Sequence, residues 1–315
     1  MRRAAMNTPQ RSRPSWQIAV SLGFAATLAL SACSAAPAPA APVEEAPVGE
    51  VDAAAAAALP EKYVKAGVIR VASDYPYPPM EMLDEDQNLT GLDFDLAQAL
   101  GVKLGVPLTL EKQAFATNIP ALQSGQSDII MSGMNDTAKR QETLDFVDYF
   151  HAGFSIMVLA GNPEKITTVL DLCGKDVAVS KATIQAEILR GYDDQCTQAG
   201  PGPIKIAELP SETDVQTAVR SGKAIADVVD SAVAAYSAQT AGDGEMFEVV
   251  RDPANPNGYN PVFTGIGVLK KDSELTSALV LALDSIIADG SYQEILEKYD
   301  LGDYAIDKAG LNLGS

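Results

Sequence analysis

Apolar and polar positions alternate with two different periods from Glu61 to the C-terminus. Short runs rich in Val and Ile predict strands, and stretches with an apolar stripe at helical spacing predict helices. In 92–104 the stripe recurs every fourth residue, which predicts a helix with one buried face, and Asp93 is its predicted N-cap. Strands and helices are predicted to alternate through the first block in the order 68–72, 92–104, 108–110, 119–123 and 128–131.

A second block repeats this alternation. Its predicted strands and helices follow in the order 177–179, 183–190, 204–209, 211–220, 224–229 and 231–239. Ser211 is the predicted cap of the helix that Gly222 ends, and a strand at 264–269 with helices from Ser273 and Ser291 completes the chain. Two such blocks predict two α/β lobes, each with a largely parallel sheet. Because open α/β sheets bind ligands beyond the carboxyl ends of their strands, two facing lobes predict a binding cleft.

The N-terminus has the pattern of a secretory signal peptide: four Arg within the first 13 residues, then an apolar run over 18–30. That run is shorter than the roughly 20 residues that a membrane-spanning helix needs. It ends in Leu30-Ser31-Ala32-Cys33, which resembles the lipobox of bacterial lipoproteins. We therefore expect cleavage after residue 32 and a lipidated Cys33 that anchors the chain to the cell membrane; the alternative is an ordinary signal peptide with a chance Cys.

Residues 33–60 are nearly all Ala, Pro, Val and Glu, which predicts a flexible tether, although the alanine run 53–58 could form a helix. The net charge of the chain is −19, and removal of 1–32, which carries four Arg and no acid, makes it −23. Such a charge excludes nucleic acid and anionic lipid headgroups as expected partners.

Cysteine usage also indicates export. Cys173 and Cys196 remain after Cys33 is assigned to the anchor, and an even pair in an exported domain predicts one disulfide. A metal site would need more Cys or His, and His151 is the only His, so no metal is expected. We interpret His151 as a packing residue.

Collinear segments of the folded part resemble the family-3 extracellular solute-binding proteins, the polar amino-acid receptors of bacterial ABC importers. The segments that carry the resemblance are 68–81, 90–96, 119–125, 128–134, 137–140, 145–148, 177–179, 230–236, 264–268 and 287–299. The resemblance implies a two-lobed periplasmic-binding-protein type II (Venus-flytrap) fold. The first lobe would hold 61–153 plus 264–315 and the second 154–263, with two crossing strands as the hinge. It also implies a monomer without cofactor that delivers an amino acid to a permease and its ATPase.

Family positions imply the residues that hold the amino acid. Arg140, three residues after Thr137, is expected to bind the ligand carboxylate in bidentate fashion, with Thr137 and the backbone of Ser132 and Gly133 adding hydrogen bonds. An Arg on a solvated helix face is the alternative. Thr183 is expected to contact the same carboxylate at a helix start in the second lobe, although the next family threonine is Ile184 here.

The resemblance assigns the remaining contacts to three kinds of residue. Asp230 is expected to receive the α-ammonium, although the family's frequent Asp five residues earlier is Ile225 here; the alternative is an N-cap. Tyr77 and Phe115, the latter in place of a common tryptophan, are expected to sandwich the ligand side chain or else to be ordinary core. Asp74 faces cationic or amide side chains in some relatives, which favours a polar or basic amino acid.

Two other classes of function remain open at this stage. The same fold has been adapted to dehydratases, so an enzyme using Asp230 as a base is one alternative. A ligand-sensing subunit that signals to a separate membrane protein is the other. The family resemblance favours a binding protein without catalytic residues over both.

Overall fold

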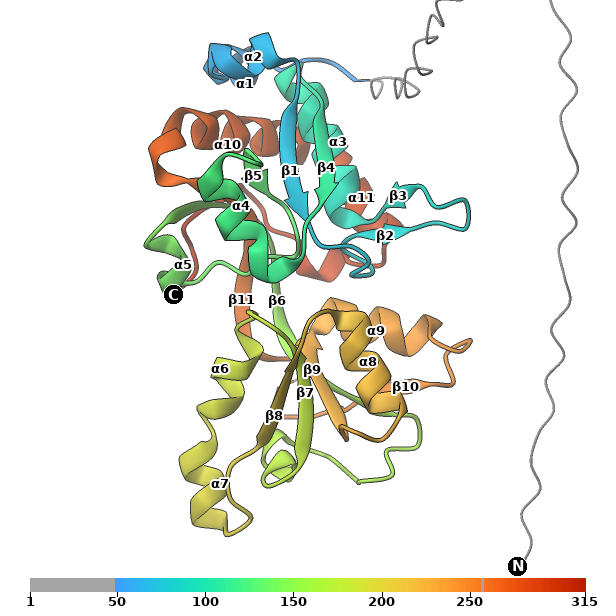
Figure 1. The fold of residues 1–315 in the computed structure, drawn as a ribbon. Coiled ribbons are helices and arrows are strands. Elements are labelled where there is room, and N and C mark those ends of the chain that lie inside the picture. Colours follow the sequence, from blue (N-terminus) through green and yellow to red (C-terminus); the bar gives the residue numbers. More distant parts are fainter. Residues whose placement is uncertain (1–48, 256–257) are drawn as a thin grey trace, which may run out of the picture. The chain divides into compact units, whose positions relative to one another are not determined.

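The computed structural model describes residues 49–255 and 258–315, so the predicted signal peptide, Cys33 and most of the predicted tether lie outside the described residues. We call the elements around β1 the first lobe and those around β7 the second lobe (Figure 1). The first lobe contains α1 Ala53–Ala58, α2 Glu61–Ala66, β1 Ile69–Ser73, β2 Met82–Leu83, β3 Leu89–Thr90, α3 Leu92–Leu104, β4 Leu108–Lys112, η1 Phe115–Thr117, α4 Asn118–Ser124, β5 Ile129–Ile130, α5 Ala138–Gln141, η3 Lys270–Asp272, α10 Ser273–Ala288, α11 Ser291–Lys298, η4 Gly302–Tyr304 and β12 Gly310–Leu311.

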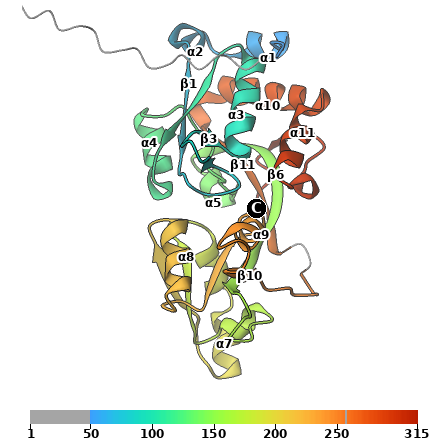
Figure 2. The same ribbon diagram turned by 90° about the vertical axis from the view of Figure 1, so that its right-hand side faces the viewer.

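The second lobe lies between two long strands that connect it to the first. It contains η2 Val169–Leu172, β7 Asp176–Ser180, α6 Gln185–Arg190, α7 Asp193–Ala199, β8 Lys205–Leu209, α8 Glu212–Arg220, β9 Ala226–Asp230, α9 Ser231–Thr240 and β10 Phe247–Val249. The connecting strands are β6 Leu144–Leu159 and β11 Tyr259–Leu269, which pair with each other in antiparallel fashion (Figure 2). Within the described ranges no single helix is long and apolar enough to cross a membrane, and only one bent helix pair, Lys270–Ala288 with Ser291–Lys298, meets that test jointly.

The main sheet has the strand order β4-β1-β5-β11-β6-β9-β7-β8, with β10 and β12 also paired to β6. In the first lobe β1 runs parallel to β4 and β5, and in the second β7 runs parallel to β8 and β9. All five residues of β9 are buried, as expected for a parallel strand covered on both faces. The predicted α/β fold with parallel strands in each lobe is confirmed.

Helix boundaries depend on local capping chemistry. Ser211 caps α8 as predicted, because its hydroxyl oxygen accepts a hydrogen bond from the Asp214 amide at 3.3 Å. The prediction for Asp93 was wrong. The N-cap of α3 is Gly91, and Asp93 lies inside the helix with its carboxylate fully buried. That carboxylate accepts hydrogen bonds from the Tyr149 hydroxyl and from the Gly133 amide at 2.8 Å, which draws it away from its own helix.

The last residues of the predicted tether belong to the folded body, and the helical alternative for the alanine run is the correct one. Asp52 caps α1 by accepting hydrogen bonds from the amides of Ala54 and Ala55, each at 2.9 Å. Ala55 and Leu59 are buried where α1 packs on α3 and α10. The small alanine side chains allow this close packing, and alanine's high helix propensity favours the helix.

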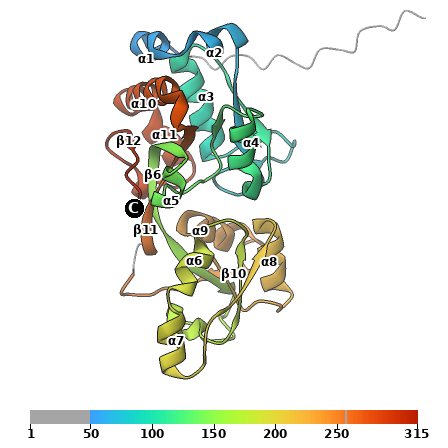
Figure 3. The same ribbon diagram turned by 60° about the vertical axis from the view of Figure 1, so that its left-hand side comes forward.

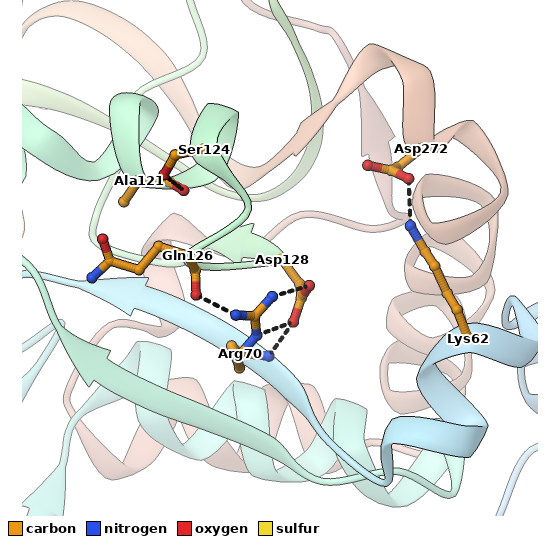
Figure 4. Close-up of polar contacts among 7 residues, drawn as sticks. All are labelled: Lys62, Arg70, Ala121, Ser124, Gln126, Asp128 and Asp272. Carbon is orange, nitrogen blue, oxygen red and sulfur yellow. Dashed lines mark hydrogen bonds and ion pairs between the residues drawn. The ribbon is translucent and has the colours of Figure 1, made fainter.

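Two ion pairs lie at the end of the first lobe that is away from the second lobe (Figures 1 and 4). The Arg70 guanidinium contacts both carboxylate oxygens of Asp128, through Nη2 at 2.9 Å and Nε at 3.0 Å, and also donates to the Gln126 carbonyl. This bidentate pair holds β1 beside the start of β5. Lys62 contacts Asp272 at 2.6 Å and so joins α2 to the turn before α10.

The predicted disulfide between Cys173 and Cys196 is confirmed. It joins the end of η2 to α7, with a Cα–Cα distance of 5.2 Å, and both residues are buried in the core of the second lobe. The disulfide therefore links α7 covalently to the segment before β7.

One buried carboxylate lies on the connecting strand β6, where the C-terminal strand β12 pairs with it. Asp148 accepts a hydrogen bond from the Leu313 amide at 3.0 Å, and its Oδ1 has no hydrogen-bond partner within the described ranges. Gly310 lies opposite it, where a Cβ atom would approach the Asp148 Cβ to 2.7 Å. Burial raises the pKa of Asp148 from 3.8 to about 7, against the opposing effect of the Leu313 hydrogen bond.

Asp148 should therefore make stability depend on pH. Because its folded-state pKa lies above its unfolded value, its favourable contribution is complete below about pH 4 and is lost as the pH rises through about 7. Asp148→Asn keeps the acceptor for Leu313, and we expect it to flatten this decline and to stabilise the protein at pH 8 by about 2–4 kcal/mol. Urea unfolding at pH 5 and pH 8 measures this, with exposed Asp303→Asn as control. Parallel pH profiles for wild type and Asp148→Asn would contradict it.

Candidate functional site

A cavity lies where the carboxyl ends of the parallel strands of both lobes meet. Its residues follow directly on strand ends: Asp74 after β1, Ser180 at the end of β7 and Asp230 at the end of β9. This is where open α/β sheets place their ligands. The lining residues from the first lobe are Asp74, Pro76, Tyr77, Phe115, Ser132, Gly133 and Asn135, and those from the second are Ser180, Thr183, Gln185, Pro210, Ser211, Glu212 and Asp230.

Asp230 reaches from the second lobe to two residues of the first. Its carboxylate accepts hydrogen bonds from the Tyr77 hydroxyl and from the Asn135 amide at 3.2 Å. Asp230 does occupy the N-cap position of α9, but its side chain makes no capping hydrogen bond. Burial raises its pKa, while the hydrogen bonds from Tyr77 and Asn135 and the charge of Arg140 oppose that rise. The carboxylate is therefore directed at the boundary between the lobes and not at its own helix.

Arg140 is 9% exposed, so the alternative of a solvated helix face is wrong. It lies on α5, which Thr137 caps by accepting a hydrogen bond from the Arg140 amide at 3.2 Å. The guanidinium donates to the carbonyl oxygens of Asn135 at 2.6 Å and, across the lobe boundary, of Ala182 at 3.1 Å. Its central carbon lies 5.5 Å from the centroid of the Phe115 ring.

The charge of Arg140 is not neutralised by an adjacent acid. Throughout 49–255 and 258–315, no carboxylate forms an ion pair with it within 4.0 Å. Burial lowers the pKa of Arg140 to about 10, and the charge of Asp230 is the largest opposing influence. Neither Arg140 nor Thr137 lines the cavity itself, but Arg140 contacts Asn135 and Phe115, which do. A buried guanidinium of this kind can bind an anionic group that enters the cavity and replaces the carbonyl groups of Asn135 and Ala182 as its hydrogen-bond acceptor.

Three predicted contacts in the first lobe have partners within the protein. The Asp74 carboxylate accepts a hydrogen bond from the Phe115 amide at 3.0 Å, and the Asp74 amide donates to the Ser132 hydroxyl at 2.9 Å. Burial raises the pKa of Asp74. The Gly133 amide, which we expected to donate to a ligand, donates to the buried Asp93 instead. Asp74 thus positions Phe115, and Asp93 positions the turn at Gly133.

Tyr77 packs directly against that turn. Gly133 has φ +53°, and a Cβ atom there would lie 3.0 Å from the Tyr77 ring, so this close approach requires glycine. Thr183 lines the cavity from the second lobe, but its hydroxyl donates to the Ser180 carbonyl at 2.6 Å. Its proton is therefore already used, and only its oxygen can accept from a ligand.

The structure adds cavity residues that sequence reasoning did not assign. Glu212 follows the cap Ser211, and Gln185 begins α6 two residues after Thr183. Both lie in segments that directly follow predicted strands of the second lobe, which is the signal that could have found them. His151 lies elsewhere, stacked on Phe263 with ring centroids 4.3 Å apart. In the part of the chain that the structure describes, no three His, Cys, Asp or Glu side chains are grouped to hold a metal ion.

A further ion pair crosses the lobe boundary at the surface. Lys139 contacts Glu187 at 2.8 Å, one residue from the buried Arg140. The two residues lie on α5 and α6, which are labelled in Figure 3. Both side chains are largely exposed, so the pair contributes little by itself. Together with the contacts of Arg140 and Asp230, it shows that α5, the loop after β5 and Tyr77 in the segment after β1 are among the parts of the first lobe that meet the second.

Comparisons with known proteins agree with this architecture. The arginine-binding protein ArgT of Corynebacterium glutamicum is 30% identical over 269 residues, which cover 84% of each chain. A solved ancestral arginine-binding protein bound to glutamine superposes with a TM-score of 0.65 at 32% identity, covering 75% of this chain and 98% of that one. An ancestral amino acid-binding protein, a precursor of cyclohexadienyl dehydratase, gives a TM-score of 0.63 at 33% identity, with 76% and 98% covered.

The family comparison covers nearly the whole folded part. Residues 69–303 match the model of the bacterial extracellular solute-binding proteins, family 3. This range includes every strand that ends at the cavity and both strands that connect the lobes. The chain belongs to the bacterial extracellular solute-binding proteins, family 3.

Proposed function

We propose that this protein is the extracytoplasmic receptor of an ABC transporter, which captures an L-amino acid with a polar or basic side chain between its lobes. The observation that carries the proposal is a buried guanidinium and a buried carboxylate at one cavity, with no ion pair between them. Asp230 lines the cavity from the second lobe, and Arg140 lies against the first-lobe lining residues Asn135 and Phe115. An amino acid is a zwitterion, and its two charges need opposite charges once they leave water. Amino-acid-binding relatives with similar sequences support this ligand class.

In the proposed complex each lobe supplies one charge. The ligand carboxylate takes the place of the carbonyl groups of Asn135 and Ala182 on Arg140. The ligand ammonium takes the place of the Tyr77 hydroxyl and the Asn135 amide on Asp230. Phe115 and Tyr77 form the apolar walls, Asp74 and Thr183 add polar groups, and the backbone of Ser132 supplies a further contact. Closure follows because only the closed form makes both sets of charge contacts.

The remaining parts of the proposal concern the chain's location and partners. We expect residues 1–32 to be removed, Cys33 to be lipidated, and the segment up to the first helix to act as a spacer from the membrane. The first lobe then comprises 61–153 with 264–315, extended at its start by α1, and the second comprises 154–263. The receptor works as a monomer and hands its ligand to a permease with ATPase subunits. We propose that it is not an enzyme; incubation with prephenate-like acids should yield no product.

Binding of each common amino acid to the purified protein tests the proposal. Trp16 is the only tryptophan and lies in the segment that we expect to be removed, so tryptophan fluorescence is unsuitable. Thermal shift is suitable, because a ligand at 100 times its dissociation constant stabilises the folded state by about 2.7 kcal/mol. Calorimetry should then give one site per chain. An amino-acid screen without any thermal shift or heat of binding would overturn the proposal.

A further inference from the structure

Two acidic side chains of the second lobe lie together beside the cavity and outside the contacts described so far. Glu212 is the first residue of α8, is 5% exposed and lines the cavity. Asp227 lies on β9, three residues before Asp230, and is completely buried. Both carboxylate oxygens of Asp227 are without a hydrogen-bond partner among the described residues. Unpartnered buried carboxylates are costly, so this pair needs a physical explanation.

The pair has few donors around it. Glu212 accepts hydrogen bonds from the Ser180 hydroxyl at 3.1 Å and, more weakly, from the Gln216 amide at 3.4 Å. In 49–255 and 258–315 no lysine, arginine or histidine forms an ion pair with Glu212 or Asp227. Burial raises the pKa of Asp227, and the neighbouring Glu212 carboxylate raises it further. Burial also raises the pKa of Glu212, so the protein disfavours two negative charges at this position.

A second observation on the same wall is independent of this pair. Gln185 lines the cavity from the start of α6 and is 2% exposed. Its side-chain oxygen is also without a hydrogen-bond partner in the described part of the chain. The second-lobe wall therefore presents free acceptor capacity on Gln185 and Glu212. A ligand group rich in N–H donors would satisfy these acceptors, whereas an apolar or carboxylate group would not.

The balance of charge in the cavity also favours a ligand side chain rich in N–H donors. In the proposed complex the ligand carboxylate neutralises Arg140 and the ligand ammonium neutralises Asp230. Asp74, Glu212 and Asp227 are then left without an ion-pair partner among the described residues. An apolar ligand side chain would leave these carboxyl groups without a partner, whereas a cationic one would pair with Glu212. The wall thus favours an amino acid with a second positive charge.

We propose that Glu212, supported from behind by Asp227, binds the cationic side chain of the ligand and sets the selectivity for basic amino acids. The inference rests on the proposed function, because it assigns the side-chain end of the same ligand. Glu212 acts as a specificity-determining residue that contacts the ligand. Asp227 acts as a positioning residue, which lies behind Glu212 and directs its carboxylate toward the cavity.

Calorimetry on the full chain in mild detergent tests the assignment with two ligands of nearly the same shape. L-arginine carries a guanidinium, and L-citrulline carries a neutral ureido group in its place. We expect wild type to prefer L-arginine, and Glu212→Gln to weaken L-arginine binding about 10- to 100-fold, the range for a hydrogen bond to a charged group. L-citrulline binding should change by less than about 3-fold, because its ureido group is neutral and its hydrogen bonds to residue 212 are weaker than those of a guanidinium. Glu245→Gln, at an exposed residue of the same lobe, is the matched control and should leave both affinities unchanged.

Each other outcome has a defined meaning. Equal losses for both ligands in Glu212→Gln would overturn the inference and show that the pair only supports α8, and no loss for either would overturn it as well. If Glu212→Gln does not fold, Asp227→Asn replaces it and should show the same selective loss to a smaller extent. Wild type that binds a neutral amino acid but neither L-arginine nor L-lysine would overturn the inference alone. Wild type that binds no amino acid would overturn the proposed function.

Discussion

Replacing Arg140 by Ala is expected to weaken amino-acid binding by about 2–5 kcal/mol, which is about 30- to several-thousand-fold. The guanidinium is buried, has no acid within ion-pair distance in the described ranges, and spans the lobe boundary through its hydrogen bond to Ala182. The ligand carboxylate would therefore be left without its only positive partner. Removing one partner of a buried pair is strongly destabilising, because it leaves the other charge without compensation.

Calorimetric titration with the best ligand from the amino-acid screen measures this loss. Arg220→Ala is the matched control, because Arg220 is exposed at the end of α8 and its side chain donates a hydrogen bond to Thr217 of its own helix. It removes the same charge from the chain, so any general electrostatic effect should appear in both variants. An affinity of Arg140→Ala within about 3-fold of the control would contradict the assignment. Such a small loss lies below that expected when a hydrogen bond to a charged group is removed.

The fold could be predicted from sequence because it rests on periodicity and local caps. The buried leucine stripe of α3 and the cap at Ser211 are local signals, and both elements form where they were predicted. Asp93 shows the limit of this reasoning. Its sequence position suits an N-cap, but a tertiary contact decides its role, because the Tyr149 hydroxyl and the Gly133 amide lie far away in sequence. A burial pattern predicts which face points inward but not which polar groups meet there.

In the candidate site, too, the positions of residues could be predicted from the sequence, whereas their tertiary hydrogen bonds could not. Asp74, Tyr77, Phe115, Thr183 and Asp230, which family positions implied, line one cavity, since strand ends place them there. The hydrogen bonds that occupy Asp74 and Gly133 could not be predicted, because they depend on the loop after β4 and on a buried helix residue. Glu212 was missed for a similar reason. An acidic residue in the first turn of a helix is usually solvated, whereas packing of α8 against β9 buries Glu212.

Replacing Asp230 by Ala should have an equally large effect on affinity and a distinct effect on shape. The ligand ammonium would lose its carboxylate, at a cost of about 2–5 kcal/mol. The same truncation removes the hydrogen bonds from Tyr77 and Asn135, which join the first lobe to the second. Asp230→Ala should therefore bind ligand weakly on the first lobe without the contraction that closure produces.

Small-angle scattering with saturating ligand separates these two effects. The radius of gyration of wild type should fall on ligand addition, and that of Asp230→Ala should not. Asp194→Ala, at an exposed acid on α7 of the same lobe, should contract like wild type. Asp230→Asn adds a further distinction, because an amide oxygen can still accept from the Tyr77 hydroxyl while the charge is gone. It should keep part of the contraction and lose the affinity. If Asp230→Ala both binds and contracts like wild type, the ammonium site lies elsewhere in the second lobe.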